Sequence, residues 1–205
     1  MKLYYAPNTI SIASVIALDE TGMAFEPVRV DFASGEQTKP AYHEINPKGR
    51  VPALVTDHGI LTETGAILEY AAASKPEAEL IPTDPWRAAH MRAAMYYLAS
   101  TMHVNHAHKM RGHRWANDEA SRADMTAKVP QTMTESCTYV VENVLTGPYV
   151  MGETFTIADP YLYVVCSWLE GDGVTVEDFP KIMAFRTAMQ SRASVKRVHD
   201  SGMLG

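Results

Sequence analysis

The predicted secondary structure changes in kind near residue 76, and this change constrains the fold more than any other feature. Before it, short apolar runs typical of strands alternate with helical patterns, whereas beyond it every periodic stretch has helical spacing. Three closely spaced prolines, Pro76, Pro82 and Pro85, mark the boundary. The sequence therefore predicts an α/β domain over residues 1–76, a linker over 77–85 and an all-helical domain over 86–205.

The first part of the chain has the pattern of a β-α-β unit. An apolar strand over 2–5 precedes a helical pattern over 11–21, and an alternating, β-branched strand follows over 26–32. We then expect a helical turn over 41–45, strands over 51–56 and 60–62, and a helix over 64–74.

The second part begins with Asp84-Pro85, a capping acid followed by proline, which is a typical helix start. Apolar residues then recur on one predicted face, namely Ala88, Met91, Met95, Leu98 and Met102. Further helices are predicted over 118–145, from Thr156 onward, and over 179–189. The Thr156–Asp159 segment resembles a capping box, so we assign these two residues a structural role.

Composition excludes several classes of function. The net charge of −6 argues against a partner that binds an overall basic field, such as a nucleic acid. No apolar stretch approaches the ~20 residues of a membrane span. Cys137 and Cys166 are too few for a disulfide framework, and both fall in apolar helical segments, where we expect core packing rather than nucleophilic chemistry. A reducing compartment, the cytoplasm, is the simplest location.

Four segments in this order resemble one known family. KLYYAPNTIS, NPKGRVPAL, LTETGAILEY and TFTIADPYL are similar to motifs of the cytosolic glutathione S-transferases, nearest the bacterial beta type. The resemblance covers essentially the whole chain. It implies a thioredoxin-like α/β domain that binds glutathione and an all-α domain that shapes the pocket of an electrophilic co-substrate. It also implies a homodimer that uses glutathione as co-substrate, without a metal or other cofactor.

The resemblance assigns the glutathione-binding residues. In the family the proline that matches Pro52 is cis, which exposes the backbone of Val51 for pairing with the cysteinyl residue of glutathione. The start of a helix at Thr64, which we expect to be its N-cap, suits the γ-glutamyl carboxylate, and Glu63 suits the ammonium. Arg50 is a candidate for the glycyl carboxylate, with Lys48 and Lys39 as alternatives.

The residue that activates the thiol stays open among several donors. The beta-type pattern has a cysteine where this chain has Ile10, followed by a serine that matches Ser11. Serine-type relatives place the hydroxyl at Thr9, and other classes use a tyrosine that matches Tyr5. We rank Ser11 first, then Thr9 and Tyr5, with Asn8 as a further candidate, because a donor at a helix start stabilises a thiolate.

His103 matches a histidine that faces glutathione in the beta type, although Val104 replaces the lysine that usually follows it. His103 and His106 can share a helix face, but no acid or thiol lies near them at ligand spacing, so we predict no metal site.

The predicted activity is glutathione transfer: the thiolate attacks a small, largely apolar electrophile in detoxification. One alternative keeps the glutathione site but reduces disulfides or peroxides. The other, from a different class, is a binding or regulatory module that retains the transferase fold without turnover.

Overall fold

The computed structural model describes all 205 residues, which form two compact units. Unit 1 comprises residues 1–82 and 190–205, and unit 2 comprises residues 83–189. The predicted succession of an α/β part and a helical part is confirmed. Residues 190–205, however, pack with the α/β part and not with the helices to which the sequence assigned them.

Unit 1 contains one four-stranded sheet with the order β2-β1-β3-β4. Its strands are β1 (Lys2–Tyr5), β2 (Glu26–Arg29), β3 (Ala53–Thr56) and β4 (Gly59–Thr62). Strands β1 and β2 are parallel, as the β-α-β pattern predicted, whereas β3 runs antiparallel to both β1 and β4. Strand β3 begins after Pro52 and not at Val51, because proline has no N–H to donate to the sheet.

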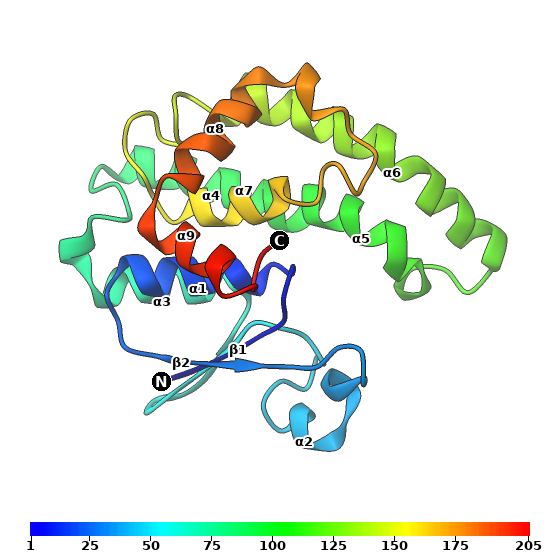
Figure 1. Cartoon of the computed structure of the whole chain (residues 1–205), viewed down its shortest axis with the longest axis horizontal. Coiled ribbons are helices and arrows are strands. Elements are labelled where there is room, and N and C mark those ends of the chain that lie inside the picture. The colour runs from blue at the N-terminus through cyan, green and yellow to red at the C-terminus, as the bar shows by residue number, and fades with distance from the viewer. The chain divides into compact units, whose positions relative to one another are not determined.

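Three helices of unit 1 pack on this sheet. Helices α1 (Ser11–Glu20) and α3 (Thr64–Ser74) cover one face, and the short α2 (Pro40–His43) lies on the other (Figure 1). The core between sheet and helices is apolar and fully buried: it includes Leu3, Leu54, Ile12, Ile16, Ile67 and Leu68. Burial of these side chains contributes about 1.5–3 kcal/mol each, which fixes the strand ends relative to the helix starts.

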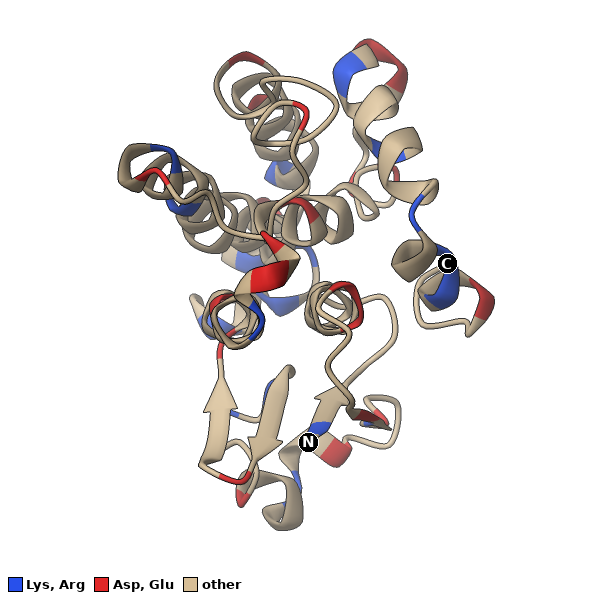
Figure 2. Cartoon of the chain, turned by 90° about the vertical axis from the view of Figure 1, so that its left-hand side faces the viewer, with Lys and Arg blue, Asp and Glu red and all other residues tan.

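The last helix, α9 (Ala193–Asp200), is attached to α1 by charged side chains. The Arg192 guanidinium donates to both carboxylate oxygens of Glu20, at 2.9 and 2.6 Å, and the Ser194 hydroxyl donates to the same carboxylate. Arg197 pairs with Asp19 at 2.6 Å. Figure 2 shows the basic segments of α9 in blue beside the C-terminal label. These bonds explain why residues 190–205 belong to unit 1.

Unit 2 is helical. Its main helices are α4 (Pro85–Tyr97), α5 (His103–Arg111), α6 (Glu119–Tyr139), α7 (Ala158–Cys166) and α8 (Pro180–Gln190). A π-helical turn over Leu98–Met102 joins α4 to α5, and another over Val140–Val144 ends α6. The Asp84 carboxylate caps α4 by accepting from the Arg87 N–H at 2.8 Å, as predicted. The predicted apolar face from Ala88 to Met102 is buried. None of the helices is both long and apolar enough to cross a membrane.

Asp159 joins the loop before α7 to the helix itself. Its carboxylate is fully buried and accepts from the N–H groups of Val150 and Thr156, at 2.7 and 2.6 Å, and from the Thr156 hydroxyl at 3.1 Å. Helix α7 begins at Ala158, so Thr156 is not its N-cap residue. The contacts nevertheless fit a structural role for this pair, because an unpaired buried carboxylate is costly.

Replacing Arg192 with Gln should lower the free energy of unfolding at pH 7 by about 2 kcal/mol, because a charged hydrogen-bonding partner of half-buried Glu20 is lost. Burial by itself raises the pKa of Glu20, but hydrogen bonds from Arg192 and Ser194 and the charges of Arg192 and Arg197 outweigh it and lower that pKa below 4.5. A carboxylic acid whose pKa is lower in the folded state than in the unfolded state stabilises the fold at pH values above its unfolded-state pKa. This stabilisation is lost as the pH falls through the folded-state pKa.

The difference in free energy of unfolding between Arg192→Gln and the unaltered protein should therefore shrink as the pH falls below 4.5. Urea unfolding at a series of pH values measures it. Arg197→Gln is the matched control and should have a much smaller effect, because the Arg197 side chain is 59% exposed. Equal losses of unfolding free energy in the two variants at pH 7 would contradict the larger stabilisation assigned to the contact between Arg192 and Glu20.

Candidate functional site

The sheet register brings three loops to one edge of unit 1. Tyr4 of β1 pairs with Ala53 of β3, and Ala53 pairs with Thr62 of β4. The residues just beyond these pairs are therefore neighbours: the end of β1 at Tyr5, the entry to β3 at Pro52, and the start of α3 after Thr62. Most residues assigned to glutathione binding from the sequence fall in these three loops.

The loop that enters β3 is held by two donors that converge on one carbonyl. The Tyr42 hydroxyl and the Asn46 side-chain amide both donate to the Arg50 carbonyl oxygen, at 2.8 and 2.7 Å. The side-chain oxygen of Asn46, Oδ1, also accepts from the Lys48 N–H at 3.1 Å. Burial is the main cause that raises the pKa of Tyr42, which stays protonated and able to donate. The hydrogen bonds from Tyr42 and Asn46 to the Arg50 carbonyl oxygen fix the backbone immediately before Val51.

Neither Tyr42 nor Asn46 was predicted to serve the site. The sequence did contain a signal for Asn46, because an asparagine before a Pro-Lys-Gly turn favours hydrogen bonds from its side chain to the backbone of the same loop. Tyr42 had none, since its partner lies eight residues away and is a backbone atom. Gly49 completes the turn with a φ of 61°, and a Cβ there would lie 2.9 Å from the Gln37 carbonyl oxygen. Only glycine fits this position.

The Val51–Pro52 peptide bond is cis, as the family resemblance implied. Val51 is half-buried and lies outside the paired register of β3, so its backbone groups are not used by the sheet. Backbone donors and acceptors that the sheet leaves unpaired are suited to an extended peptide-like ligand.

Helix α3 begins at Thr64, and the residue in the N-cap position is Glu63. The expectation that Thr64 is the N-cap is therefore wrong. The reason is that Glu63, with φ 73° and ψ 127°, has the non-helical backbone of a cap, whereas Thr64 is already helical. Glu63 occupies a region that L-residues rarely adopt, and such positions cluster at functional sites. The first N–H groups of α3 have no helical partner and favour an anion.

The Glu63 side chain is exposed and pairs with Lys48. Their ion pair measures 2.6 Å, with Lys48 41% and Glu63 69% exposed, and Lys48 also donates to the Thr62 hydroxyl at 2.8 Å. An exposed ion pair contributes only about 0–1 kcal/mol, so a ligand that carries an ammonium can replace Lys48 at little cost. The guanidinium-bearing Arg50 is likewise exposed beside this loop.

The loop between β1 and α1 contains a pair of hydroxyl groups. Thr9 Oγ1 and Ser11 Oγ are 2.7 Å apart. The Thr9 hydroxyl donates to the Ala6 carbonyl oxygen at 2.8 Å, and Ser11 Oγ accepts from the Ala6 N–H at 3.1 Å. Ser11 is fully buried, whereas Thr9 is partly exposed. Thr9 is thus the outer member of the pair and Ser11 the inner one.

The remaining candidates for thiol activation have different surroundings. Tyr5 ends β1 and is 8% exposed. Asn8 has a left-handed backbone with φ 56°; its N–H donates to the Met203 carbonyl oxygen and its side-chain oxygen accepts from the Gly205 N–H, both at 3.0 Å. The carboxyl-terminal segment of unit 1 therefore holds this loop in place.

The two cysteines lie in unit 2 and are fully buried. Burial raises the pKa of Cys137 to about 12 and raises that of Cys166 further. Neither can provide a thiolate near neutral pH, in agreement with the role in core packing that the sequence predicted.

His103 begins α5 in unit 2, where its ring lies 5.1 Å from that of Trp168 and 6.4 Å from that of His106. Its assignment to glutathione binding stays a prediction. The structure contains no group of three or more His, Cys, Asp or Glu side chains arranged to hold a metal ion.

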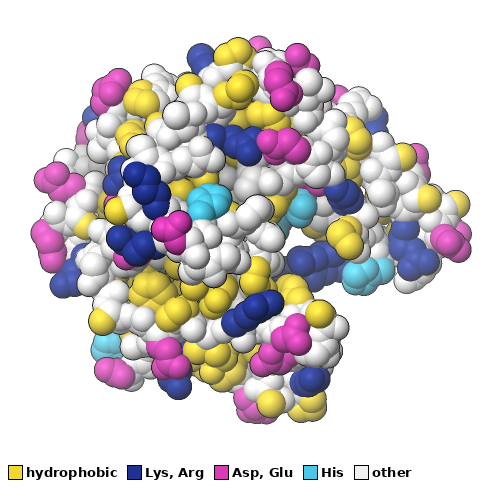
Figure 3. Space-filling view, in the orientation of Figure 1, with side chains coloured by type: hydrophobic (Ala, Val, Ile, Leu, Met, Phe, Trp, Pro, Cys, Tyr) yellow, Lys and Arg dark blue, Asp and Glu magenta, His cyan; other side chains and the backbone are white.

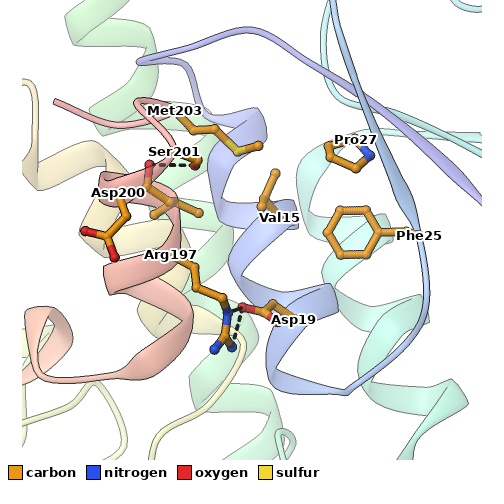
Figure 4. Close-up of a pocket in the computed structure, with 9 residues that line it drawn as sticks. Val15, Asp19, Phe25, Pro27, Arg197, Asp200, Ser201 and Met203 are labelled. Carbon is orange, nitrogen blue, oxygen red and sulfur yellow. Dashed lines mark hydrogen bonds and ion pairs between the residues drawn. The ribbon is translucent and has the colours of Figure 1, made fainter.

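A recess of about 480 Å³ lies elsewhere in unit 1. In Figure 3 hydrophobic side chains gather above β2 on this face. Figure 4 shows Val15, Phe25, Pro27 and Met203 around the recess, with the Asp19–Arg197 ion pair at its edge. None of the residues predicted to bind glutathione lines it. The recess is mostly apolar, and Arg197 at its edge is already paired with Asp19.

Comparison with known proteins identifies the family of both units. Residues 1–73 match the amino-terminal domain of glutathione S-transferase, and residues 105–201 match its carboxyl-terminal domain. A crystal structure of a glutathione transferase homologue from Sulfitobacter with bound glutathione is 60% identical. It covers 99% of this chain and 98% of its own, with a TM-score of 0.97.

Two curated relatives also span the chain. Glutathione S-transferase GstA of Escherichia coli O157:H7 is 32% identical over 96% of both chains. Maleylacetoacetate isomerase of Pseudomonas aeruginosa is 28% identical over 97% of this chain and 95% of its own. The chain belongs to the glutathione S-transferase family. Within it, the protein is a glutathione transferase of the bacterial type, with a thioredoxin-like unit 1 and a helical unit 2.

Removing the Asn46 amide should loosen the loop before Val51. Asn46→Ala leaves the Arg50 carbonyl with one donor and the Lys48 N–H without its acceptor, so we expect the free energy of unfolding to fall by about 1–3 kcal/mol. Tyr42→Phe, which removes only one donor and keeps the ring, should cost about 1 kcal/mol. Urea denaturation measures both. A smaller loss for Asn46→Ala than for Tyr42→Phe would contradict the account of this loop.

Proposed function

We propose that this protein binds glutathione at the three-loop edge of unit 1 and transfers its thiolate to small, largely apolar electrophiles. The observation that supports this most strongly is the register, which brings the cis Val51–Pro52 bond, the start of α3 and the Thr9–Ser11 hydroxyl pair to one edge of the sheet. A homologue of 60% identity binds glutathione, which supports the same ligand here.

The proposed contacts follow the chemistry of the tripeptide. The cysteinyl backbone pairs antiparallel with Val51 beside Pro52, extending the sheet by a short segment. The γ-glutamyl carboxylate accepts from the first N–H groups of α3 and from the Thr64 hydroxyl, and the Glu63 carboxylate takes the ammonium in place of Lys48. Arg50 pairs with the glycyl carboxylate.

The proposed donor to the thiolate is Thr9. Ser11 was ranked first from the sequence, but its hydroxyl is fully buried against Ala6, which favours a role in orienting its neighbour. When Thr9 turns its hydrogen to the sulfur, the Ser11 hydroxyl donates to Thr9 Oγ1 and strengthens the bond. The thiolate then attacks the electrophile, with orientation and anion stabilisation as the enzyme's contribution.

We further propose that the enzyme works in the cytoplasm as a homodimer. Both cysteines are free, as expected in a reducing compartment. Unit 2 exposes large side chains on α4, including Trp86 at 73% and Tyr96 at 66%, which is typical of a protein–protein surface. Light scattering at micromolar concentration should give twice the mass of 22.6 kDa, and a monomer would contradict the proposal.

Glu63→Gly should separate ligand binding from stability. Glycine relieves the left-handed backbone, so the free energy of unfolding should stay the same or rise by about 1 kcal/mol. Affinity for glutathione should nevertheless fall about tenfold or more, because the charged partner of the ammonium is lost. Calorimetric titration and urea unfolding measure the two effects. Glu63→Gln, which keeps size and backbone, is the matched control for charge, and undiminished affinity in both variants would rule out the proposed contact.

Thr9→Val should raise the pKa of the bound glutathione thiol and lower turnover at neutral pH by about tenfold, since one donor to an anion is lost while the helix start remains. Ser11→Ala should have a smaller effect, and Tyr5→Phe almost none. Thiolate absorbance of the binary complex follows the pKa. If Ser11→Ala or Tyr5→Phe shifted it more than Thr9→Val, the donor would be assigned to that residue instead.

The activity itself is tested with the unaltered protein and two substrates, a halogenated nitroaromatic and a glutathione-linked disulfide. We expect glutathione-dependent release of halide from the first to exceed reduction of the second. Reduction alone would favour a reductase, and no turnover of either, with glutathione still bound, would favour a binding module.

A further inference from the structure

The apolar recess of unit 1 has no part in the proposed glutathione site, although it lies in the same unit. Val15 of α1 lies between two walls (Figure 4). One wall contains Phe25 and Pro27, at the start of β2, and the other contains Val198 of α9 and Met203 in the segment that follows it. The volume of about 480 Å³ lies within the range of about 300–1,000 Å³ that is typical of small-molecule sites.

The polar groups at the recess are paired with one another or point away from it. The Arg197 guanidinium contacts the Asp19 carboxylate through two nitrogens, each at 2.6 Å. The Ser201 hydroxyl donates to the Val198 carbonyl oxygen at 3.2 Å. In Figure 4 the Asp200 carboxylate points away from the recess. A charged ligand would lose its hydration without gaining a partner, so the recess suits a neutral, apolar molecule.

Met203 belongs both to the recess and to the contacts that hold the β1–α1 loop. Its side chain lines the recess, and its carbonyl oxygen accepts from the Asn8 N–H at 3.0 Å. The Met203 N–H donates to the Val198 carbonyl oxygen at 2.9 Å. The Gly205 N–H donates to the Asn8 side-chain oxygen at 3.0 Å. Residues 203–205 thus connect one wall of the recess to Asn8.

Asn8 directly precedes Thr9, the proposed donor to the thiolate. Its φ of 56° is a left-handed conformation that residues other than glycine rarely adopt, so contacts from outside the loop must stabilise it. The Thr9 hydroxyl is placed by the Ala6 carbonyl oxygen at 2.8 Å and by Ser11 Oγ at 2.7 Å. Firmer contacts from residues 203–205 to Asn8 therefore place the Thr9 hydroxyl more firmly.

We propose that the recess is a regulatory site for neutral, apolar organic molecules, and that its occupant strengthens glutathione binding through Met203 and Asn8. A short segment after the last helix opens locally at a lower free energy than the core. Met203 completes the wall of the recess only while the segment is held, so the occupant binds the held state more tightly and raises its population. This inference rests on the proposed function, because it takes Thr9 as part of the glutathione site.

The coupling between the two sites must be reciprocal, and this gives the first test. The probe is N-phenyl-1-naphthylamine, a neutral aromatic molecule whose fluorescence rises in apolar surroundings. Calorimetric titration with glutathione should give an affinity about fivefold higher when the probe is saturating, and titration with the probe should give the same factor when glutathione is saturating. Independent binding of the two ligands would overturn the proposal.

Two recess variants and a matched control locate the probe. Phe25→Ser removes part of one apolar wall, and Pro27→Glu places a charge there from an exposed position, so each should weaken probe binding about tenfold or more. Phe32→Ser changes a half-buried phenylalanine outside the recess and should leave the affinity for the probe as it is. Undiminished affinity in both recess variants would place the probe elsewhere and overturn the proposal.

Two variants of Asn8 test the connection. Asn8→Gly keeps the left-handed backbone but removes the acceptor of the Gly205 N–H, so the probe should still bind while its effect on glutathione affinity becomes smaller. Asn8→Asp keeps an acceptor and should keep the coupling. The same coupling factor in Asn8→Gly as in the unaltered protein would contradict the route through Asn8.

Hydrogen exchange separates failure of this proposal from failure of the proposed function. With the probe bound and no glutathione present, exchange of the Asn8 and Gly205 N–H groups should become slower. Unchanged exchange at both groups would overturn the regulatory role of the recess. If glutathione did not bind the unaltered protein, the proposed function would be contradicted, whereas slower exchange would still support the connection between the recess and the β1–α1 loop.

Discussion

The carbonyl oxygen of Arg50 accepts two hydrogen bonds, from the Tyr42 hydroxyl and the Asn46 amide, and the geometry of the proposed site depends on them. They hold the backbone that leads into the cis Val51–Pro52 bond, which lies outside the sheet register. Because Ala53 pairs with both Tyr4 and Thr62, a loop fixed before β3 lies next to the end of β1 and the start of α3. A ligand with the backbone and charges of a short peptide then meets prepared groups in all three loops.

The hydroxyl pair at the start of α1 is supported from the opposite end of the sequence. Glu20 accepts from Arg192 and Ser194 at one end of α1, and Asn8 bonds to Met203 and Gly205 at the other. The helix whose start carries Thr9 and Ser11 is thus fixed at both ends by residues of unit 1. This arrangement holds the proposed donor in place. An oriented hydrogen bond and a helix start both stabilise a thiolate.

Patterns among residues close in sequence predicted much of the fold and part of the proposed site. The alternation over residues 26–32 predicted β2, although the strand ends earlier, at Arg29. The Asp84-Pro85 start and the apolar spacing from Ala88 to Met102 predicted their helical elements, because each depends on neighbours in sequence. Long-range pairs were not predictable: Glu20 and Arg192 lie 172 residues apart, and His106 and Asp172 lie 66 apart. The burial of Ser11 was not predictable either, because it depends on contacts of the β1–α1 loop with Ala6, which the sequence does not show. The cis bond at Pro52 was inferred from family resemblance alone.

The most direct test of the central claim is a crystal structure of the protein with glutathione. The account predicts that the cysteinyl backbone pairs antiparallel with Val51, that the γ-glutamyl group lies at Glu63 and Thr64, and that the sulfur is within hydrogen-bond distance of Thr9 Oγ1. Glutathione bound away from the three-loop edge, or with its sulfur turned away from the start of α1, would contradict it.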